Sequence, residues 1–159
     1  MPVETQIALW ALAVIAPVLL NLATKSSTDA LGLSAMLLLI WCFGRVTGAI
    51  YGPPQSMALY PVIDAFAGAT AFVAWRTRRA WWKLALVGLF LGQCTLHAAF
   101  WLAWPQDGSL YHYVLANNVL FIGELITVSV PGGAHVLGRI VDRVPGWPRG
   151  VHHARTRRG

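Results

Sequence analysis

The chain has 159 residues, of which 57% are hydrophobic and 11% are charged, and its formal net charge is +6. Soluble domains carry about a quarter of their residues as Asp, Glu, Lys and Arg, so this composition excludes an ordinary soluble domain and predicts one membrane domain. The positive charge is interpreted as a signal of membrane orientation, and nucleic-acid binding is not expected.

Five apolar stretches follow one another along the chain, each close to the roughly 20 residues that a helix needs to cross a bilayer. The first is expected to be a retained helix and not a secretory signal, because Glu4 precedes it and no Lys or Arg does. The sequence therefore predicts an all-α, polytopic transmembrane helix bundle within residues 1–133. Its five spans are expected at residues 7–24, 31–50, 57–75, 81–104 and 111–130.

The Lys and Arg residues set the expected orientation. All of them except Arg45 lie between spans one and two, between spans three and four or just inside the fourth, or after span five. Cytoplasmic segments of membrane proteins are enriched in Lys and Arg, so the N-terminus is expected outside and the C-terminus inside. The basic residues of the three inner segments are Lys25, Arg76, Arg78, Arg79, Lys83, Arg139, Arg143, Arg149, Arg155, Arg157 and Arg158.

The fifth span is expected to end at Pro131, Gly132 and Gly133, which do not favour continuation of a helix. Residues 134–144 place apolar side chains on one side and charged ones around the other, which predicts a separate interfacial amphipathic helix on the cytoplasmic side. Residues 145–159 have little to bury and are expected to be a disordered basic tail. Anionic lipid or a partner protein is expected to contact Arg139, Arg143, Arg149, Arg155, Arg157 and Arg158.

Four ionisable side chains inside the predicted spans are the first functional candidates, because a charge in hydrocarbon is costly unless it has a partner or water. They are Arg45, Asp64, His97 and Glu124. A rise of about 1.5 Å per residue from the outer ends of spans two and three places Arg45 and Asp64 at similar depths. An ion pair between them is expected, either as a structural bridge between the two spans or as a gate or ion site.

Polar side chains also recur on spans four and five. Gln93 and His97 are four residues apart and share a face, and Asn117 and Glu124 are seven apart and share a stripe. The helical rise sets His97 level with Asn117 and Asn118, and Gln93 level with Glu124, so polar contacts between the two spans are expected. Such contacts can simply hold the helices together. The alternative is a proton or cation path in which His97 and Glu124 titrate.

Two GxxxG patterns, Gly44 to Gly48 and Gly88 to Gly92, permit close approach of helices within one chain or between copies in a homo-oligomer. Metal and cofactor sites are not expected, because the histidines within the spans and loops fall at different depths and the cysteines lack metal spacing. The sequence has no nucleophile elbow, phosphate-binding loop or Ser, His and Asp set at a credible position. An enzyme is therefore not expected.

Three stretches carry a resemblance to known proteins: YGPPQSMALYPVIDA at residues 51–65, HAAFWLAW at residues 97–104, and the span-five run that ends in VPGG at residues 130–133. They resemble small multi-span proteins of unassigned function from bacterial phage and prophage genomes. The resemblance implies a bacterial cytoplasmic membrane and a role at the host envelope, including lysis as a holin or exclusion of competing phage. It transfers no functional residue.

Two functions fit these observations. The first is a non-enzymatic interaction or envelope-modifying protein whose bundle is held by its polar contacts and whose tail touches lipid or a membrane-protein partner. The second is a membrane-permeabilising or conducting protein, holin-like or a proton or cation channel, that self-associates through its glycine faces and conducts past the four ionisable groups. The first needs fewer assumptions. Neutralising Asp64 or Glu124 separates them, because only the second predicts altered ion flux in protein that still folds.

Overall fold

The computed structural model describes residues 2–52, 55–107 and 110–142, and helices account for nearly all of them. Each of the five long helices, the third taken together with the short 3-10 helix before it, is long and apolar enough to cross a membrane. This confirms the predicted all-α bundle and indicates a small multi-pass membrane protein. The elements are α1 (Val3–Ala23), α2 (Thr28–Tyr51), the 3-10 helix η1 (Gln55–Leu59), α3 (Tyr60–Thr77), α4 (Trp81–Asp107) and α5 (Leu110–Val141).

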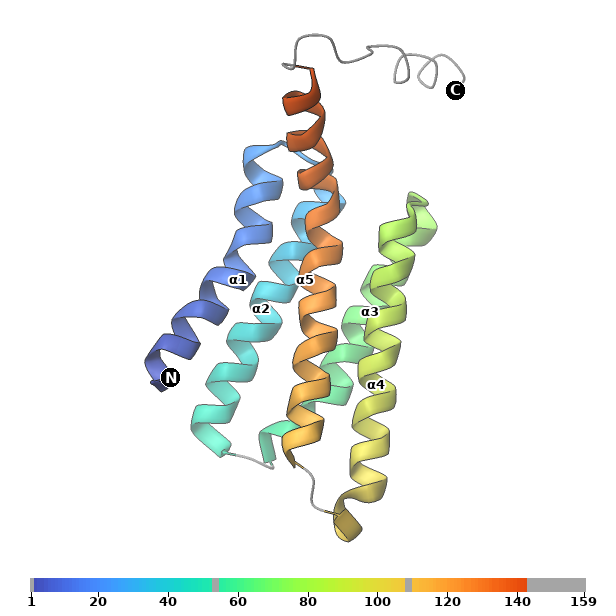
Figure 1. Cartoon of the computed structure of the whole chain (residues 1–159). Helices are drawn as coiled ribbons and strands as arrows, with labels where there is room; N and C mark the ends of the chain where they lie inside the picture. The colour runs from blue at the N-terminus through green and yellow to red at the C-terminus, as the bar shows by residue number, and fades with distance from the viewer. Residues whose placement is uncertain (1, 53–54, 108–109, 143–159) are drawn as a thin grey trace.

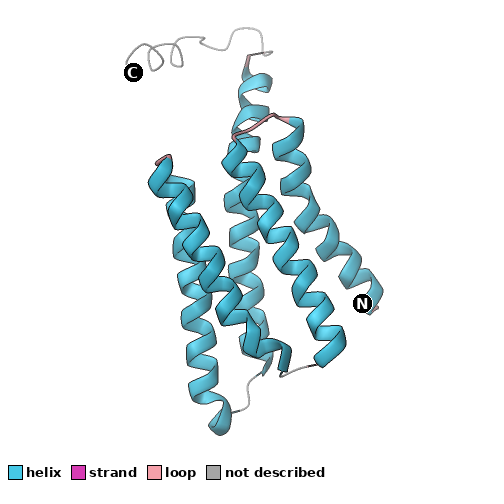
Figure 2. Cartoon of the chain, turned by 180° about the vertical axis from the view of Figure 1, so that it is seen from behind, coloured by secondary structure: helices cyan, strands magenta, loops and turns pink. Residues whose placement is uncertain are grey.

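Successive helices alternate in direction and form two hairpins that are joined by the last helix (Figure 1). Helix α1 packs on α2, and α3 packs on α4. Helix α5 lies between the two pairs and contacts α1, α2 and α4. From behind, α2 is seen between α1 and α3 (Figure 2). Both hairpins therefore pack on α5.

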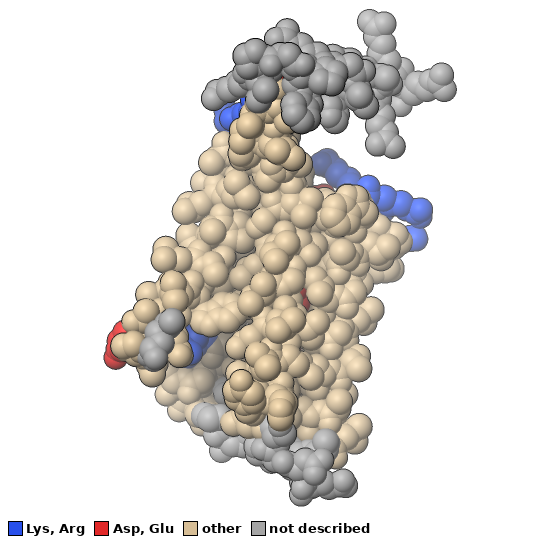
Figure 3. Space-filling model, viewed as in Figure 1, with Lys and Arg blue, Asp and Glu red and all other residues tan. Residues whose placement is uncertain are grey.

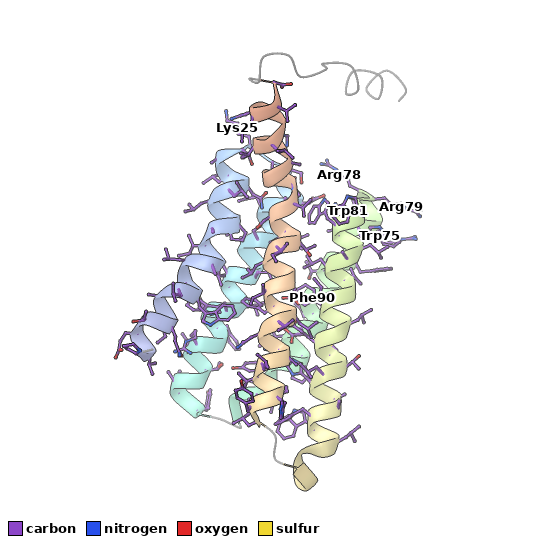
Figure 4. All side chains as sticks on the ribbon, in the orientation of Figure 1. Lys25, Trp75, Arg78, Arg79, Trp81 and Phe90 are labelled. Atoms are coloured by element: carbon purple, nitrogen blue, oxygen red, sulfur yellow. The ribbon has the colours of Figure 1, made fainter. Side chains whose placement is uncertain are left out.

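The two ends of the bundle differ in charge. The α1–α2 and α3–α4 connections lie at the same end as the last turns of α5, and Lys25, Arg78 and Arg79 project there (Figure 4). We call this the basic end, and the end that holds η1 the opposite end. On the face drawn in Figure 3, Lys and Arg gather mainly at the basic end and the surface between the ends is almost entirely uncharged.

The sides of the bundle are apolar. Large hydrophobic side chains are exposed on every long helix, among them Leu12, Leu39, Phe66, Leu102 and Ile126. A soluble protein rarely exposes so much contiguous apolar surface. The lateral surface is therefore suited to lipid hydrocarbon and not to water.

Asn21 ties three helices together near the basic end. Its side chain is 1% exposed, and its amide nitrogen donates to the hydroxyl of Ser34 on α2 at 2.8 Å and to the carbonyl of Val128 on α5 at 2.9 Å. Its amide oxygen accepts from the hydroxyl of Ser26 at 2.7 Å. A buried amide needs such partners to offset its desolvation. Asn21 is therefore a polar anchor between α1, α2 and α5, and sequence analysis assigned it no role.

Lys83 closes the basic end between the two hairpins. Although Lys is rarely buried, this side chain is 2% exposed. Its ammonium pairs with the carboxylate of Asp29 in the first turn of α2 and donates to the carbonyls of Ala74 and Arg78, at 2.9 and 2.8 Å, where α3 ends. Three acceptors thus satisfy three N–H donors. This residue was expected only to mark orientation, and its structural role depends on contacts between distant segments.

Helix α5 does not stop where the sequence predicted. It runs to Val141 with Pro131 inside it, so residues 134–141 continue the same helix and do not form a separate one. Proline removes one N–H of the helix, which leaves the carbonyl of Thr127 without its usual donor. Packing compensates, because Gly132 lies directly against Leu20 and Asn21 of α1. Residues 143 and 144 and the tail at 145–159 lie outside the described residues.

Candidate functional site

A cavity of about 680 Å³ lies in the half of the bundle nearer the opposite end and is partly open to the surface. All five long helices contribute to its wall. The apolar part of the wall includes Trp10 and Phe121, whose rings meet with centroids 6.0 Å apart. The polar side chains in the wall are Gln6, Arg45, Tyr60, Asp64, Gln93, Tyr113, Asn117 and Asn118.

Small residues and helix divergence create this space. The N-terminal end of α1 splays away from α5 (Figure 1), and α2 presents Gly44 and Gly48 to the cavity. A Cβ atom added at Gly48 would meet nothing within 4 Å, whereas one at Gly44 would meet the Tyr60 ring at 3.7 Å. Gly48 is therefore a point at which the cavity can be filled without displacing neighbouring atoms.

Asp64, His97 and Tyr113 form a hydrogen-bonded chain across α3, α4 and α5. Nε2 of His97 lies 2.7 Å from Oδ2 of Asp64, and Nδ1 of His97 lies 2.7 Å from the hydroxyl of Tyr113. The ring of Phe100 packs on Tyr113 with centroids 4.2 Å apart and covers the chain. His97 is 1% exposed and does not line the cavity, whereas Asp64 and Tyr113 do.

Both ring nitrogens of His97 are used in this hydrogen-bonded chain, Nε2 with the carboxylate of Asp64 and Nδ1 with the hydroxyl of Tyr113. The ring is therefore held from both sides, whereas the carboxylate is held through one oxygen. One carboxylate oxygen of Asp64 thus bonds to His97 within the bundle, and Asp64 also faces the cavity.

The expected ion pair between Arg45 and Asp64 does not form. The carboxylate pairs with His97 instead, and the described residues provide no ion-pair partner for Arg45. Both residues nevertheless line the same cavity. The depth estimate could not show that His97 on the next helix, and not Arg45, pairs with Asp64. Arg45 is left exposed and faces the cavity.

Among the described residues, the expected polar contacts between α4 and α5 form in one place. His97 bonds to Tyr113, one turn away from the predicted partners Asn117 and Asn118. Gln93 and Glu124 do not bond to each other within the described structure: both carboxyl oxygens of Glu124 and the amide oxygen of Gln93 are buried and lack a hydrogen-bond partner, as does the amide oxygen of Asn117. Glu124 is 0% exposed.

The two GxxxG patterns do not make the closest helix contacts within the described chain, and packing between copies stays a prediction. Gly92 contacts Leu120 of α5 at ordinary distance, and a Cβ atom at Gly88 would meet nothing within 4 Å. The closest approaches involve three other glycines, because helix register and not motif spacing selects the contact points. In each case an added Cβ atom would come within 3.2 Å of a neighbouring side chain: Gly68 at Phe90, Gly123 at Leu89 and Gly132 at Leu20.

Arg139 is the one predicted lipid-contact residue that the structure describes, and it is exposed on the last turns of α5. The other five, Arg143, Arg149, Arg155, Arg157 and Arg158, lie outside the described residues.

Within residues 2–52, 55–107 and 110–142, no three His, Cys, Asp or Glu side chains lie close enough to hold a metal ion. The cavity and the Asp64–His97–Tyr113 hydrogen-bonded chain form the candidate site within the described residues.

Two buried polar residues to which the sequence analysis gave no role could have been found, because each is a single polar side chain within an apolar stretch. Asn21 and Ser34 each interrupt an apolar span, and both are buried and hydrogen-bonded. Tyr113 lies within the fifth predicted span as well, and it completes the hydrogen-bonded chain. No protein-family model matches the chain, and comparisons with curated proteins and with solved structures find no match.

Proposed function

We propose that the chain is a non-enzymatic binding protein of a bacterial cytoplasmic membrane and that it holds an amphipathic ligand in the cavity. The observation that carries the proposal is the cavity of about 680 Å³ at membrane depth, which combines apolar rings with a cluster of polar side chains. Ligand sites in proteins typically measure about 300–1,000 Å³ and have a mostly apolar lining with a few placed polar groups. A membrane lipid has both kinds of surface and reaches the site from the bilayer.

The setting of the cavity supports this proposal. The basic end faces the cytoplasm in the proposed orientation, because Lys and Arg are enriched on that side of membranes. The cavity then opens in the outer half of the bilayer. The basic tail would add attraction to anionic lipid of the inner surface. Ligand capture in the outer half and anchoring at the inner surface together describe an envelope-modifying protein, whether it acts as one copy or as a homo-oligomer.

Filling the cavity should remove the ligand without unfolding the bundle. Gly48→Leu adds a side chain where an added Cβ atom meets nothing within 4 Å, on the cavity wall. We expect it to lower the amount of lipid that co-purifies in mild detergent by about tenfold, equivalent to 1.4 kcal/mol of binding free energy. Native mass spectrometry of the purified protein, with lipid extraction, measures this ratio.

The matched control is Gly88→Leu. Gly88 also has nothing within 4 Å of an added Cβ atom, but it does not line the cavity. This variant should retain lipid as the unchanged protein does. Equal retention by both variants, or an unchanged protein that carries no lipid in any mild detergent, would contradict the proposed function.

A second candidate function, proton conduction, is favoured by Glu124. Its carboxyl is 0% exposed and neither oxygen has a hydrogen-bond partner within the described structure. A carboxylate so placed is costly, so in this second candidate Glu124 is protonated and exchanges its proton through the cavity. Asn117, two turns from Glu124 on α5, lines the cavity and also has an unpartnered oxygen.

Glu124→Gln tests this second candidate in liposomes that contain a pH-sensitive dye and carry an imposed membrane potential. Conduction predicts proton flux above protein-free liposomes and its loss in the variant. Glu4→Gln is the matched control, because Glu4 is an exposed carboxylate near the start of α1 and should leave the flux unchanged. Flux at the protein-free level for the unchanged protein would rule conduction out and leave ligand binding as the function.

A further inference from the structure

Two opposite charges line the cavity without pairing with each other. Arg45 comes from α2 and Asp64 from α3, and no ion pair joins Arg45 to any acidic group within the described residues. A guanidinium at membrane depth requires an anion or water to offset its desolvation. Its planar fork of N–H donors matches two oxygens of a phosphate. The α2 side of the cavity therefore offers a phosphate site.

Hydrogen-bond acceptors without donors occur elsewhere on the same wall. Asp64 uses one carboxylate oxygen for His97, and the other accepts no hydrogen bond from the described residues. The amide oxygens of Gln93 and Asn117 also lack donors, and both residues line the cavity. Both oxygens are buried, so each would accept from a ligand in the cavity only after its amide group rotates about its last torsion. These residues offer three acceptors and one negative charge.

A primary ammonium group is the headgroup that complements these acceptors. It carries one positive charge and three N–H donors, one for each acceptor. A quaternary ammonium has no N–H and would leave the acceptors unpaired, at a cost in binding free energy. An uncharged polyol headgroup could donate hydrogen bonds but would leave the charge of Asp64 uncompensated. The acceptor set thus discriminates among common phospholipid headgroups.

We infer that the cavity binds a phospholipid with a primary ammonium headgroup, such as phosphatidylethanolamine, with its phosphate at Arg45 and its ammonium at Asp64, Gln93 and Asn117. Trp10 and the rest of the apolar wall contact the glycerol and upper acyl region. His97 and Tyr113 act as positioning residues, because they hold the carboxylate of Asp64 in place. The inference rests on the proposed function and names the headgroup of its ligand.

Competition among three lipids with identical acyl chains tests the inference. Delipidated protein is placed in mixed micelles that contain equal amounts of phosphatidylethanolamine, phosphatidylcholine and phosphatidylglycerol, and native mass spectrometry measures bound lipid. The unchanged protein should prefer the ethanolamine headgroup over each of the others by at least about tenfold. Charge-assisted hydrogen bonds of the ammonium, which the other two headgroups lack, produce this preference.

Two variants test the phosphate contact and the ammonium contact separately. Arg45→Gln removes the phosphate contact, so binding of all three lipids should fall by about tenfold. Asp64→Asn keeps an oxygen that accepts from His97 but loses the charge, so only the preference for the ethanolamine headgroup should disappear. Arg45 is exposed and makes no ion pair in the described structure, so its substitution leaves the fold intact and keeps the test valid if Asp64→Asn folds poorly. Arg78→Gln, at the basic end, is the control and should change neither affinity nor preference.

Each outcome has a distinct meaning. Equal binding of the three headgroups, or a preference for phosphatidylglycerol, overturns the headgroup assignment while the proposed function stands. If Arg45→Gln binds the three lipids as well as the unchanged protein does, the assignment of the phosphate to Arg45 is wrong. Absence of any bound lipid in the unchanged protein overturns the proposed function together with this inference.

Discussion

Replacing Lys83 with Met should lower the free energy of unfolding by about 3 kcal/mol, the lower end of the range for breaking a buried ion pair by removing one partner. The ammonium of Lys83 is 2% exposed and satisfies the carboxylate of Asp29 and two carbonyls at the end of α3. Methionine fills a similar volume but donates no hydrogen bond, so all three acceptors lose their partner at once. Titration with sodium dodecyl sulfate, followed by tryptophan fluorescence, measures the change.

Lys25→Met controls for the loss of one positive charge at the basic end. Lys25 is exposed, and its backbone has a φ of 50°, which Met adopts no better and no worse than Lys. Its substitution should change the free energy of unfolding by less than about 0.5 kcal/mol. If the two variants unfolded at the same detergent fraction, Lys83 would not join the two hairpins in the way that its contacts indicate.

Gly132→Ala should lower the free energy of unfolding by about 2 kcal/mol, although alanine favours helices more than glycine does. A Cβ atom at this position would lie 2.8 Å from Cγ of Leu20 and 2.9 Å from the amide oxygen of Asn21. Neither neighbour can move freely. The nearest atom of Leu20 is Cγ, the branch point of its side chain close to the backbone, and Asn21 is held by hydrogen bonds to Ser26, Ser34 and Val128. The contact of α1 with α5 must therefore loosen, and the same detergent titration measures it.

Gly133→Ala is the matched control one residue later in the same helix. An added Cβ atom at Gly133 meets nothing within 4 Å, so the helix propensity of alanine should stabilise the protein by about 0.5–1 kcal/mol. The two variants are thus expected to change stability in opposite directions. A stabilising effect of both would show that α1 does not pack tightly against α5 at Gly132.

The five helices were predictable because their cause is local. A backbone in hydrocarbon must satisfy its own hydrogen bonds, so each long apolar run becomes a helix whatever surrounds it. Helix ends also followed local signals in places: Ser27 accepts a hydrogen bond from the backbone of Ala30 at the start of α2, and Gly52 ends this helix with a φ of 66°. Both are residue types that favour those positions.

The end of α5 was mispredicted for a physical reason. Pro131, Gly132 and Gly133 each disfavour a helix locally, but Gly132 also permits α1 to approach closely. Burial against Leu20 and the hydrogen bond from Asn21 to the carbonyl of Val128 outweigh the local preference. The same glycine is a helix breaker in sequence and a contact point in the folded bundle.

The candidate site shows where prediction from sequence ends. Residue type and depth selected Arg45, Asp64, His97 and Glu124 as ionisable groups that need partners or water. They did not assign the partners, because a helix can rotate about its axis and several polar groups at one depth compete for the same carboxylate. The packing of α3, α4 and α5 decided that His97 takes Asp64 and Tyr113 takes His97.

Sequence by itself determined that this protein is a bundle of five apolar helices and that every basic residue except Arg45 lies near or beyond the ends of these helices. Both properties follow from segment length, hydrophobicity and the positions of Lys and Arg along the chain. Tertiary structure decided which polar groups meet, which glycines lie at contacts, and that a cavity remains between Arg45 and Asp64. These depend on rotation, tilt and register of whole helices. Packing of side chains far apart in the chain sets those variables.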